Sequence, residues 1–165
     1  MIKDLNTQAL TDKRKEGLVT AIYIGAIFIL IAVIYFINTG IWDSIVNFFS
    51  SLTLAQVPGA ASISLPAPAN PAAYTELYIA AFQFSLGIGL LEIIVLALRV
   101  LLHSPVARKA ETVGNIVFWL GASYLITTYL VNMTIESEWF VFWAGIIMIF
   151  GLSLVARAFV LLAKR

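Results

Sequence analysis

The stretch GIGLLEIIVLALRVLLH, residues 87–103, decides the fold because it places a carboxylate, Glu92, inside an apolar helix long enough to cross a lipid bilayer. A bilayer core of about 30 Å requires about 20 apolar residues at about 1.5 Å per helical residue. An ionised carboxylate in hydrocarbon costs at least a few kcal/mol, so Glu92 has to face protein or water, meet a cation, or take up a proton. The rest of the chain has to supply those surroundings.

The composition indicates a membrane protein. Of 165 residues, 61% are hydrophobic and 12% are charged, and the mean hydropathy is +0.97. Soluble domains are about half apolar and about a quarter charged. We therefore predict a single membrane domain, residues 1–165, whose main surroundings are the lipid bilayer.

The net charge and the counts of cysteine and histidine argue against several kinds of binding and catalytic site. A net charge of +1 gives no field that would attract nucleic acid. The chain has no cysteine, which excludes disulfides, thiolate metal sites and a cysteine nucleophile. With one histidine, His103, it also has no cluster for a haem pair or a zinc site. We predict no bound metal and no cofactor.

Four long apolar runs predict an all-α polytopic membrane protein, a bundle of four transmembrane helices. The first run is longer than the core of a signal peptide and no small-residue cleavage pattern follows it, so we interpret it as a retained span. A polar segment, residues 1–16, precedes it. The predicted spans are residues 17–37, 74–102, 112–131 and 139–163.

The first loop carries an extra helical pattern. Residues 41–56, IWDSIVNFFSSLTLAQ, are too short and too polar to cross a bilayer, but their apolar side chains recur at helical spacing. We predict an amphipathic helix that lies in the membrane interface. A lid packed over the ends of the spans fits the pattern equally well. The prolines of residues 57–73 predict an irregular loop.

The lysines and arginines set the orientation, because basic residues that flank spans stay on the cytoplasmic side. They precede span one, lie between spans two and three, and follow span four, while the other two loops have none. The inner halves of spans two and four hold Arg99 and Arg157. We therefore predict a multi-pass protein of the cell membrane with cytoplasmic N- and C-termini.

Glu92 needs a partner at its own depth. Helical steps of three, four and seven place Ser85, Glu92, Arg99 and His103 on one stripe of span two. Span four runs in the same direction and brings Arg157 within axial reach. We predict that Glu92 pairs with Arg157 or Arg99 in a buried ion pair that fixes which helices meet. A proton or cation pathway and a ligand site are the alternatives.

Span three is unusually polar. One stripe holds Thr112, Asn115, Ser123 and Thr127. Hydrogen bonds between helices are the favoured interpretation, each contributing about 0.6 kcal/mol. The alternative is a water-lined path made when such helices repeat around an axis.

Small residues indicate where helices come close. Ala144, Gly151 and Ala158 recur every seven positions in span four, and Ala21 with Gly25 forms a small-xxx-small pair in span one. Both patterns permit close backbone contact. They fit an internal contact and a contact with a neighbouring subunit equally.

The motifs of common enzyme classes are absent. The sequence has no phosphate loop, no HExxH and no GxSxG. We therefore predict that the protein is not an enzyme. The leading function is a non-catalytic subunit of a homo- or hetero-oligomeric membrane complex, with other membrane subunits as partners. The alternative is an oligomeric ion channel or small-solute transporter with the polar third span and Glu92 in its pathway.

Overall fold

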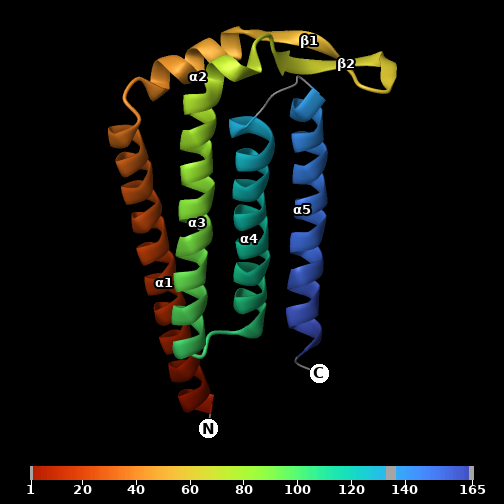
Figure 1. Ribbon diagram of the computed structural model, residues 1–165. Helices are drawn as coiled ribbons and strands as arrows, with labels where there is room; N and C mark the ends of the chain where they lie inside the picture. Colours follow the sequence, from red (N-terminus) through yellow and green to blue (C-terminus); the bar gives the residue numbers. More distant parts are fainter. Residues whose placement is uncertain (1, 133–136, 164–165) are drawn as a thin grey trace.

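The computed structural model describes residues 2–132 and 137–163, which form four long helices with a small cap at one end (Figure 1). Each long helix contains a stretch long and apolar enough to cross a membrane, which confirms the prediction of four such helices. They are α1 (Ile2–Ile37), α3 (Thr75–Leu101), α4 (Val106–Leu125) and α5 (Ser137–Leu162).

The cap is built from the segment between α1 and α3. A short helix, α2 (Ile41–Ser50), leads into an antiparallel hairpin of β1 (Leu52–Val57) and β2 (Ala60–Pro68), and a 3-10 turn, η1 (Pro71–Tyr74), enters α3. Figure 1 shows the cap at one end of the long helices and both chain ends at the other. We call these the cap end and the terminal end.

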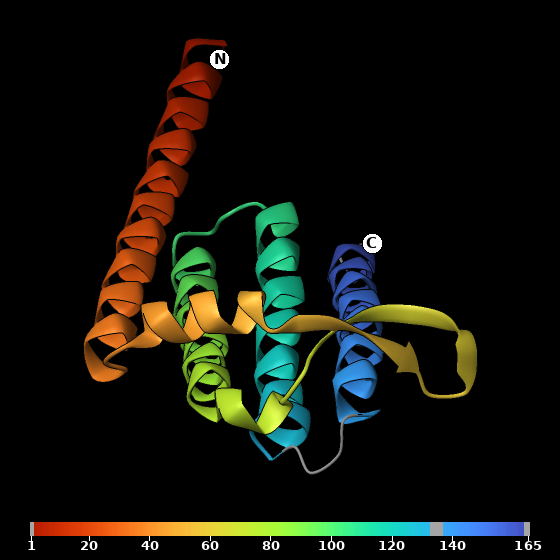
Figure 2. The same cartoon turned by 90° about the horizontal axis from the view of Figure 1, so that it is seen from above.

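The long helices stand in a row rather than in a closed square. Figure 2 shows the order α1, α3, α4, α5, with α1 tilting away from the others toward its N-terminus. Each long helix packs mainly on its neighbours in this row. The row therefore has two uncovered ends, one on α1 and one on α5.

Glycines set the close contacts within the row. A Cβ atom at Gly89 of α3 would lie 2.5 Å from Leu120 Cδ2 of α4, and one at Gly121 of α4 would lie 2.7 Å from Ile149 of α5. A larger residue at either position requires the facing Leu120 or Ile149 side chain, or the helix that carries it, to move. Glycine is therefore what allows α3, α4 and α5 to pack this closely.

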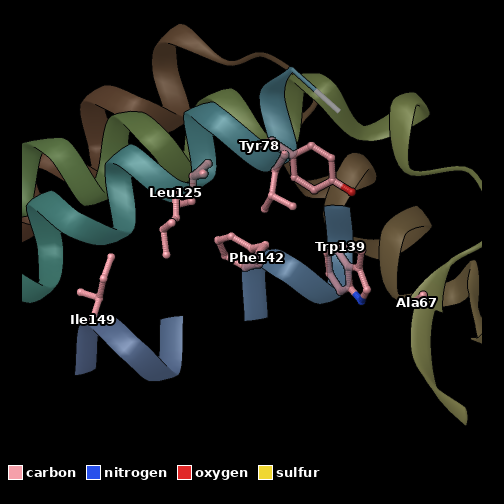
Figure 3. Packing of buried hydrophobic residues seen from close by; sticks show 8 residues of the cluster. Ala67, Tyr78, Leu125, Trp139, Phe142 and Ile149 are labelled. Atoms are coloured by element: carbon pink, nitrogen blue, oxygen red, sulfur yellow. The ribbon is translucent and has the colours of Figure 1, made fainter. Parts of the chain in front are cut away.

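A cluster of large side chains fixes the cap to the long helices (Figure 3). Tyr78 of α3 and Phe142 and Trp139 of α5 are buried, and the Trp139 indole N–H donates to the carbonyl oxygen of Pro66 in β2 at 3.1 Å. Phe48 of α2 meets the Tyr78 ring edge to face, with centroids 6.3 Å apart. The cap is therefore packed against α3 and α5.

The prediction for the cap segment was wrong in two places. The helix predicted over residues 41–56 ends at Ser50, and the predicted irregular loop, residues 57–73, contains β2. Pro58 and Gly59 form the hairpin turn, where Gly59 has φ 82°, the left-handed value that glycine adopts without strain. Each strand of a two-stranded hairpin has a free edge, so Pro66 and Pro68, in the last three residues of β2, are tolerated there.

Two long helices, α1 and α4, have boundaries that differ from the predicted ones. α1 is continuous from Ile2, so the polar residues before span one extend the same helix. α4 begins at Val106 and ends in a π-helical turn, η2 (Ile126–Val131). Asn132 closes this turn by donating its side-chain amide to the carbonyl oxygen of Thr127 at 2.8 Å.

The close contact at Gly89 predicts a strong effect of substitution. Gly89→Val places its Cβ against the Leu120 side chain, which has to move together with its neighbours. We expect a loss of about 1–3 kcal/mol, as for other overpacked cores. The measurement is thermal unfolding of the purified protein in mild detergent. The matched control is Gly17→Val, because a Cβ at Gly17 meets nothing within 4 Å. Equal stability of the two variants would contradict the packing of α3 on α4.

Candidate polar site around Glu92

Glu92 lies near the middle of α3, where three helices meet. Its side chain is almost fully buried, with 2% of the residue exposed. Tyr23 of α1 donates its hydroxyl to Glu92 Oε1 at 2.8 Å, and Asn115 of α4 donates its side-chain amide to the same oxygen at 2.8 Å. One carboxylate oxygen therefore joins α1, α3 and α4.

Arg99 makes a second connection between the same helices, two turns or about 10 Å closer to the terminal end. Its Nε lies 3.8 Å from Glu16 Oε2 of α1. Its Nη1 donates to the carbonyl oxygen of Arg108 at 2.9 Å and to Thr112 Oγ1, both in α4. The guanidinium is thus held between α1 and α4.

A third polar contact joins α1 to α3 at the cap end. Asn38, which follows α1, donates its side-chain amide to Gln83 Oε1 of α3 at 2.9 Å. The same amide donates to the carbonyl oxygen of Ile34 at 2.9 Å. Polar contacts therefore bind α1 to α3 at three levels, whereas most of the apolar surface of α1 is exposed.

Among the side chains that the structure describes, Glu92 forms no ion pair with Arg157 or Arg99, so this prediction was wrong. Arg99 is in contact with Glu16 and α4 instead. Arg157 is exposed on α5, and α5 packs on α4, which separates it from α3. The close approach at Gly114, whose Cβ would lie 3.1 Å from the Ser153 carbonyl oxygen, fixes α5 on that side.

His103 lies apart from the other residues of the predicted stripe. It is exposed and lies just beyond α3, with φ 56°. The backbone N–H of Ser104 returns to the carbonyl oxygen of Arg99 at 2.9 Å, which closes the end of the helix. His103 therefore shapes the turn between α3 and α4 and does not reach Glu92.

The predicted polar stripe of span three divides into two parts. Thr112 and Asn115 bond to α3, as described above. Ser123 donates its hydroxyl to the Leu120 carbonyl oxygen at 2.8 Å, and Thr127 donates to the Ser123 carbonyl oxygen at 3.0 Å. The first pair joins helices, and the second pair bonds to its own helix.

Tyr23 is the site residue that the sequence analysis missed. It is a hydroxyl-bearing residue in the half of span one nearer the terminal end, and Glu92 lies in the corresponding half of span two. Matching depths between spans one and two would have made Tyr23 a candidate. A neutral donor, and not a cation, is what Glu92 meets on α1.

A second candidate feature is an apolar cavity of about 650 Å³ between the cap and the outer face of α5. Aromatic side chains of the cap and of α5 line it. Its lining residues are Phe48, Phe49, Leu52, Val57, Leu65, Pro66, Trp139, Phe140, Trp143, Ala144 and Ile147. For metal binding, the described part of the chain has no group of three His, Asp or Glu side chains that could hold an ion.

Comparison of the chain with protein families, with curated proteins and with solved structures gives no match.

The bond from Tyr23 predicts a selective loss of stability. Tyr23→Phe removes one of the two donors to Glu92 Oε1, and we expect a loss of about 0.5–1.5 kcal/mol in detergent unfolding. Tyr35→Phe is the matched control, because Tyr35 is on the same helix and is 64% exposed. If the control loses as much stability as Tyr23→Phe, the hydrogen bond to Glu92 does not hold α1.

Proposed function

We propose that this protein is an integral membrane protein and a non-catalytic subunit that associates laterally with copies of itself or with other membrane subunits. The observation that carries the proposal is the open row of helices. In both end helices, α1 and α5, only 11% of the most apolar 18-residue stretch is buried. Such long exposed apolar helix faces require contact with lipid or with another apolar helix.

The exposed side chains of the end helices support placement in a membrane. Phe28 and Ile29 of α1 are 68% and 67% exposed, and Ile147 and Phe159 of α5 are 73% and 67% exposed. In water such a surface would drive aggregation. In hydrocarbon it is at its most stable, and the helical backbone meets its own hydrogen bonds there.

The charges support an orientation with the terminal end in the cytoplasm. Within residues 2–132 and 137–163, every lysine and arginine lies in the half of the molecule, measured along the long helices, that is nearer the terminal end. Asp43 and Glu76 lie near the cap end. Lys164 and Arg165, which the sequence analysis also assigned to the cytoplasm, lie outside the described residues.

The face of α5 opposite α4 supports lateral association. Ala144, Gly151 and Ala158 are all exposed, and a Cβ at Gly151 meets nothing within 4 Å. Seven-residue steps drift by only about 20° around a helix, so the three residues form one narrow strip. Small residues in a strip are the usual surface through which membrane helices approach one another.

The polar contacts around Glu92 support a structural role over a catalytic one. Tyr23 of α1 and Asn115 of α4 each donate a hydrogen bond to Glu92 of α3. Among the described residues, no nucleophile with an adjacent base accompanies them, as covalent catalysis would require. The proposal therefore assigns these bonds to helix assembly.

The second candidate function is a channel or small-solute transporter. The polar side chains Gln83, Glu92 and Arg99, spread along α3, favour it, because intramembrane ionisable groups commonly mark ion paths. Flux across proteoliposomes that is altered by Glu92→Gln would support this candidate. Absence of flux in well-inserted protein would leave the subunit role.

The proposed topology predicts a labelling pattern that the cysteine-free sequence makes simple to read. Single-cysteine variants Ser64→Cys in β2 and Ala107→Cys at the start of α4 both change exposed positions. In intact cells, a membrane-impermeant maleimide is expected to label Ser64→Cys only, and Ala107→Cys should react after permeabilisation. The reverse pattern contradicts the orientation, and equal labelling of both contradicts the membrane placement.

Lateral association predicts a particle larger than one chain. We expect the protein in lipid nanodiscs or mild detergent to have a protein mass, without the mass of lipid or detergent, above the 18.1 kDa of a monomer. Gly151→Leu fills the strip on α5 and is expected to weaken an assembly that uses this face by at least tenfold in dissociation constant, which is about 1.4 kcal/mol. Met148→Leu is the control, since Met148 is exposed on α5 outside the strip. A monomer with no co-purifying chain argues against the subunit role.

A further inference from the structure

Arg157 is a charged side chain on an apolar, uncovered face of α5. The residue is exposed. Leu154 and Leu161, which lie one turn away from it on the same face, are 50% and 44% exposed. A guanidinium keeps its charge, so it does not enter hydrocarbon as a neutral group. In the membrane placement proposed above, Arg157 therefore needs an anion or water within reach of its side chain.

The protein itself does not supply that anion. Arg157 forms no hydrogen bond and no ion pair within the described part of the chain. Its Cβ lies 3.5 Å from the place that a Cβ at Gly114 of α4 would take. The side chain of Arg157 therefore starts beside α4, and α4 is the helix on which a partner would be expected.

Glu111 is the carboxylate of α4 at this level. The rings of Phe118 on α4 and Phe150 on α5 meet edge to face, with centroids 6.4 Å apart. Seven residues from Phe118 toward the terminal end lies Glu111, and seven residues from Phe150 in the same direction lies Arg157. Such a step covers about 10.5 Å and returns to nearly the same side of a helix. Glu111 is paired with Arg108 at 3.1 Å, which leaves the charge of Arg157 uncompensated.

The depth of Arg157 corresponds to the lipid headgroups at the terminal end. The 26 residues of α5 give a helix of about 39 Å, whereas the hydrocarbon core is about 30 Å thick. A centred helix thus projects by about 4–5 Å at each end. Arg157 precedes Leu162, the last residue of α5, by five residues or about 7.5 Å. Its Cα is then about 3 Å inside the hydrocarbon boundary, and a long arginine side chain spans that distance.

We propose that Arg157 binds the phosphate of an anionic lipid in the leaflet at the terminal end. The guanidinium donates in parallel to two phosphate oxygens, as its planar fork allows. The acyl chains lie along the exposed apolar face of α5, which includes Leu154 and Phe150. A zwitterionic lipid carries its own cation beside the phosphate, so an anionic lipid is preferred. This site rests on the membrane placement proposed above.

The lipid and a neighbouring subunit can be bound at the same time. The strip of Ala144, Gly151 and Ala158 faces away from α4, whereas Arg157 starts beside α4. The phosphate site therefore lies between the contact with α4 and the strip proposed for lateral association.

Native mass spectrometry of the full chain in mild detergent tests the site, with phosphatidylglycerol as the anionic probe and phosphatidylcholine as the zwitterionic reference. Wild type is expected to retain phosphatidylglycerol in preference. Arg157→Gln is expected to weaken that retention at least tenfold and to leave retention of phosphatidylcholine unchanged. Lys15→Gln is the matched control, because it removes the same charge from an exposed position of α1. It should retain phosphatidylglycerol as wild type does.

Unchanged retention in Arg157→Gln overturns the proposal, and so does an equal loss in Lys15→Gln, which would show an effect of net charge alone. Displacement of the lipid by inorganic phosphate would assign the site to a free anion and not to a lipid. If Arg157→Gln does not fold, Arg157→Met replaces it with the same expected loss, since its apolar side chain is stable in hydrocarbon.

The same spectra give the number of chains in each particle. A monomer that retains phosphatidylglycerol contradicts the proposed subunit role and supports the lipid site, whereas an oligomer without lipid preference does the reverse. A second protein chain that accompanies wild type and is lost in Arg157→Gln would place a protein carboxylate at Arg157. That result also overturns the lipid site.

Discussion

The structure depends on the burial of one carboxyl group. Glu92 sits in an apolar helix, so its hydrogen-bond partners have to come from other helices. Tyr23 and Asn115 provide them and thereby place α1 and α4 beside α3 at one level. Arg99 repeats the arrangement two turns away, with Glu16 and α4 on its two sides. In this way α3 becomes the helix on which α1 and α4 are positioned.

Two kinds of contact hold the row together, and they act in different places. Between α3, α4 and α5, glycines such as Gly89 and Gly121 allow close packing of backbones. Between α1 and α3, polar side chains at three levels contribute much of the specificity. A membrane would favour both kinds, because it removes the hydrophobic drive to close the row into a compact bundle. In the function proposed above, lipid or neighbouring subunits cover the two uncovered ends.

Much of the helix content could be predicted from the sequence, because four apolar runs of sufficient length have few other solutions. The cap could not: prolines at 66 and 68 suggested a loop, but a two-stranded hairpin tolerates them at its free edges. The depth of Glu92 and the polarity of Asn115 were visible in the sequence. Which helix faces which was not, since depth along the helices also puts Arg157 within reach of Glu92 and only packing at Gly114 shows that Arg157 lies on the far side of α4.

The central claim is that Glu92 is held by neutral donors from α1 and α4. Solid-state NMR of the protein in lipid bilayers, with ¹³C-labelled glutamate and ¹⁵N-labelled asparagine and arginine, measures this contact directly. The account predicts a cross-peak between Glu92 Cδ and Asn115 Nδ2 that disappears in Asn115→Leu. A Glu92 carboxyl group without this cross-peak, in contact with the guanidinium nitrogens of Arg157 instead, would contradict it.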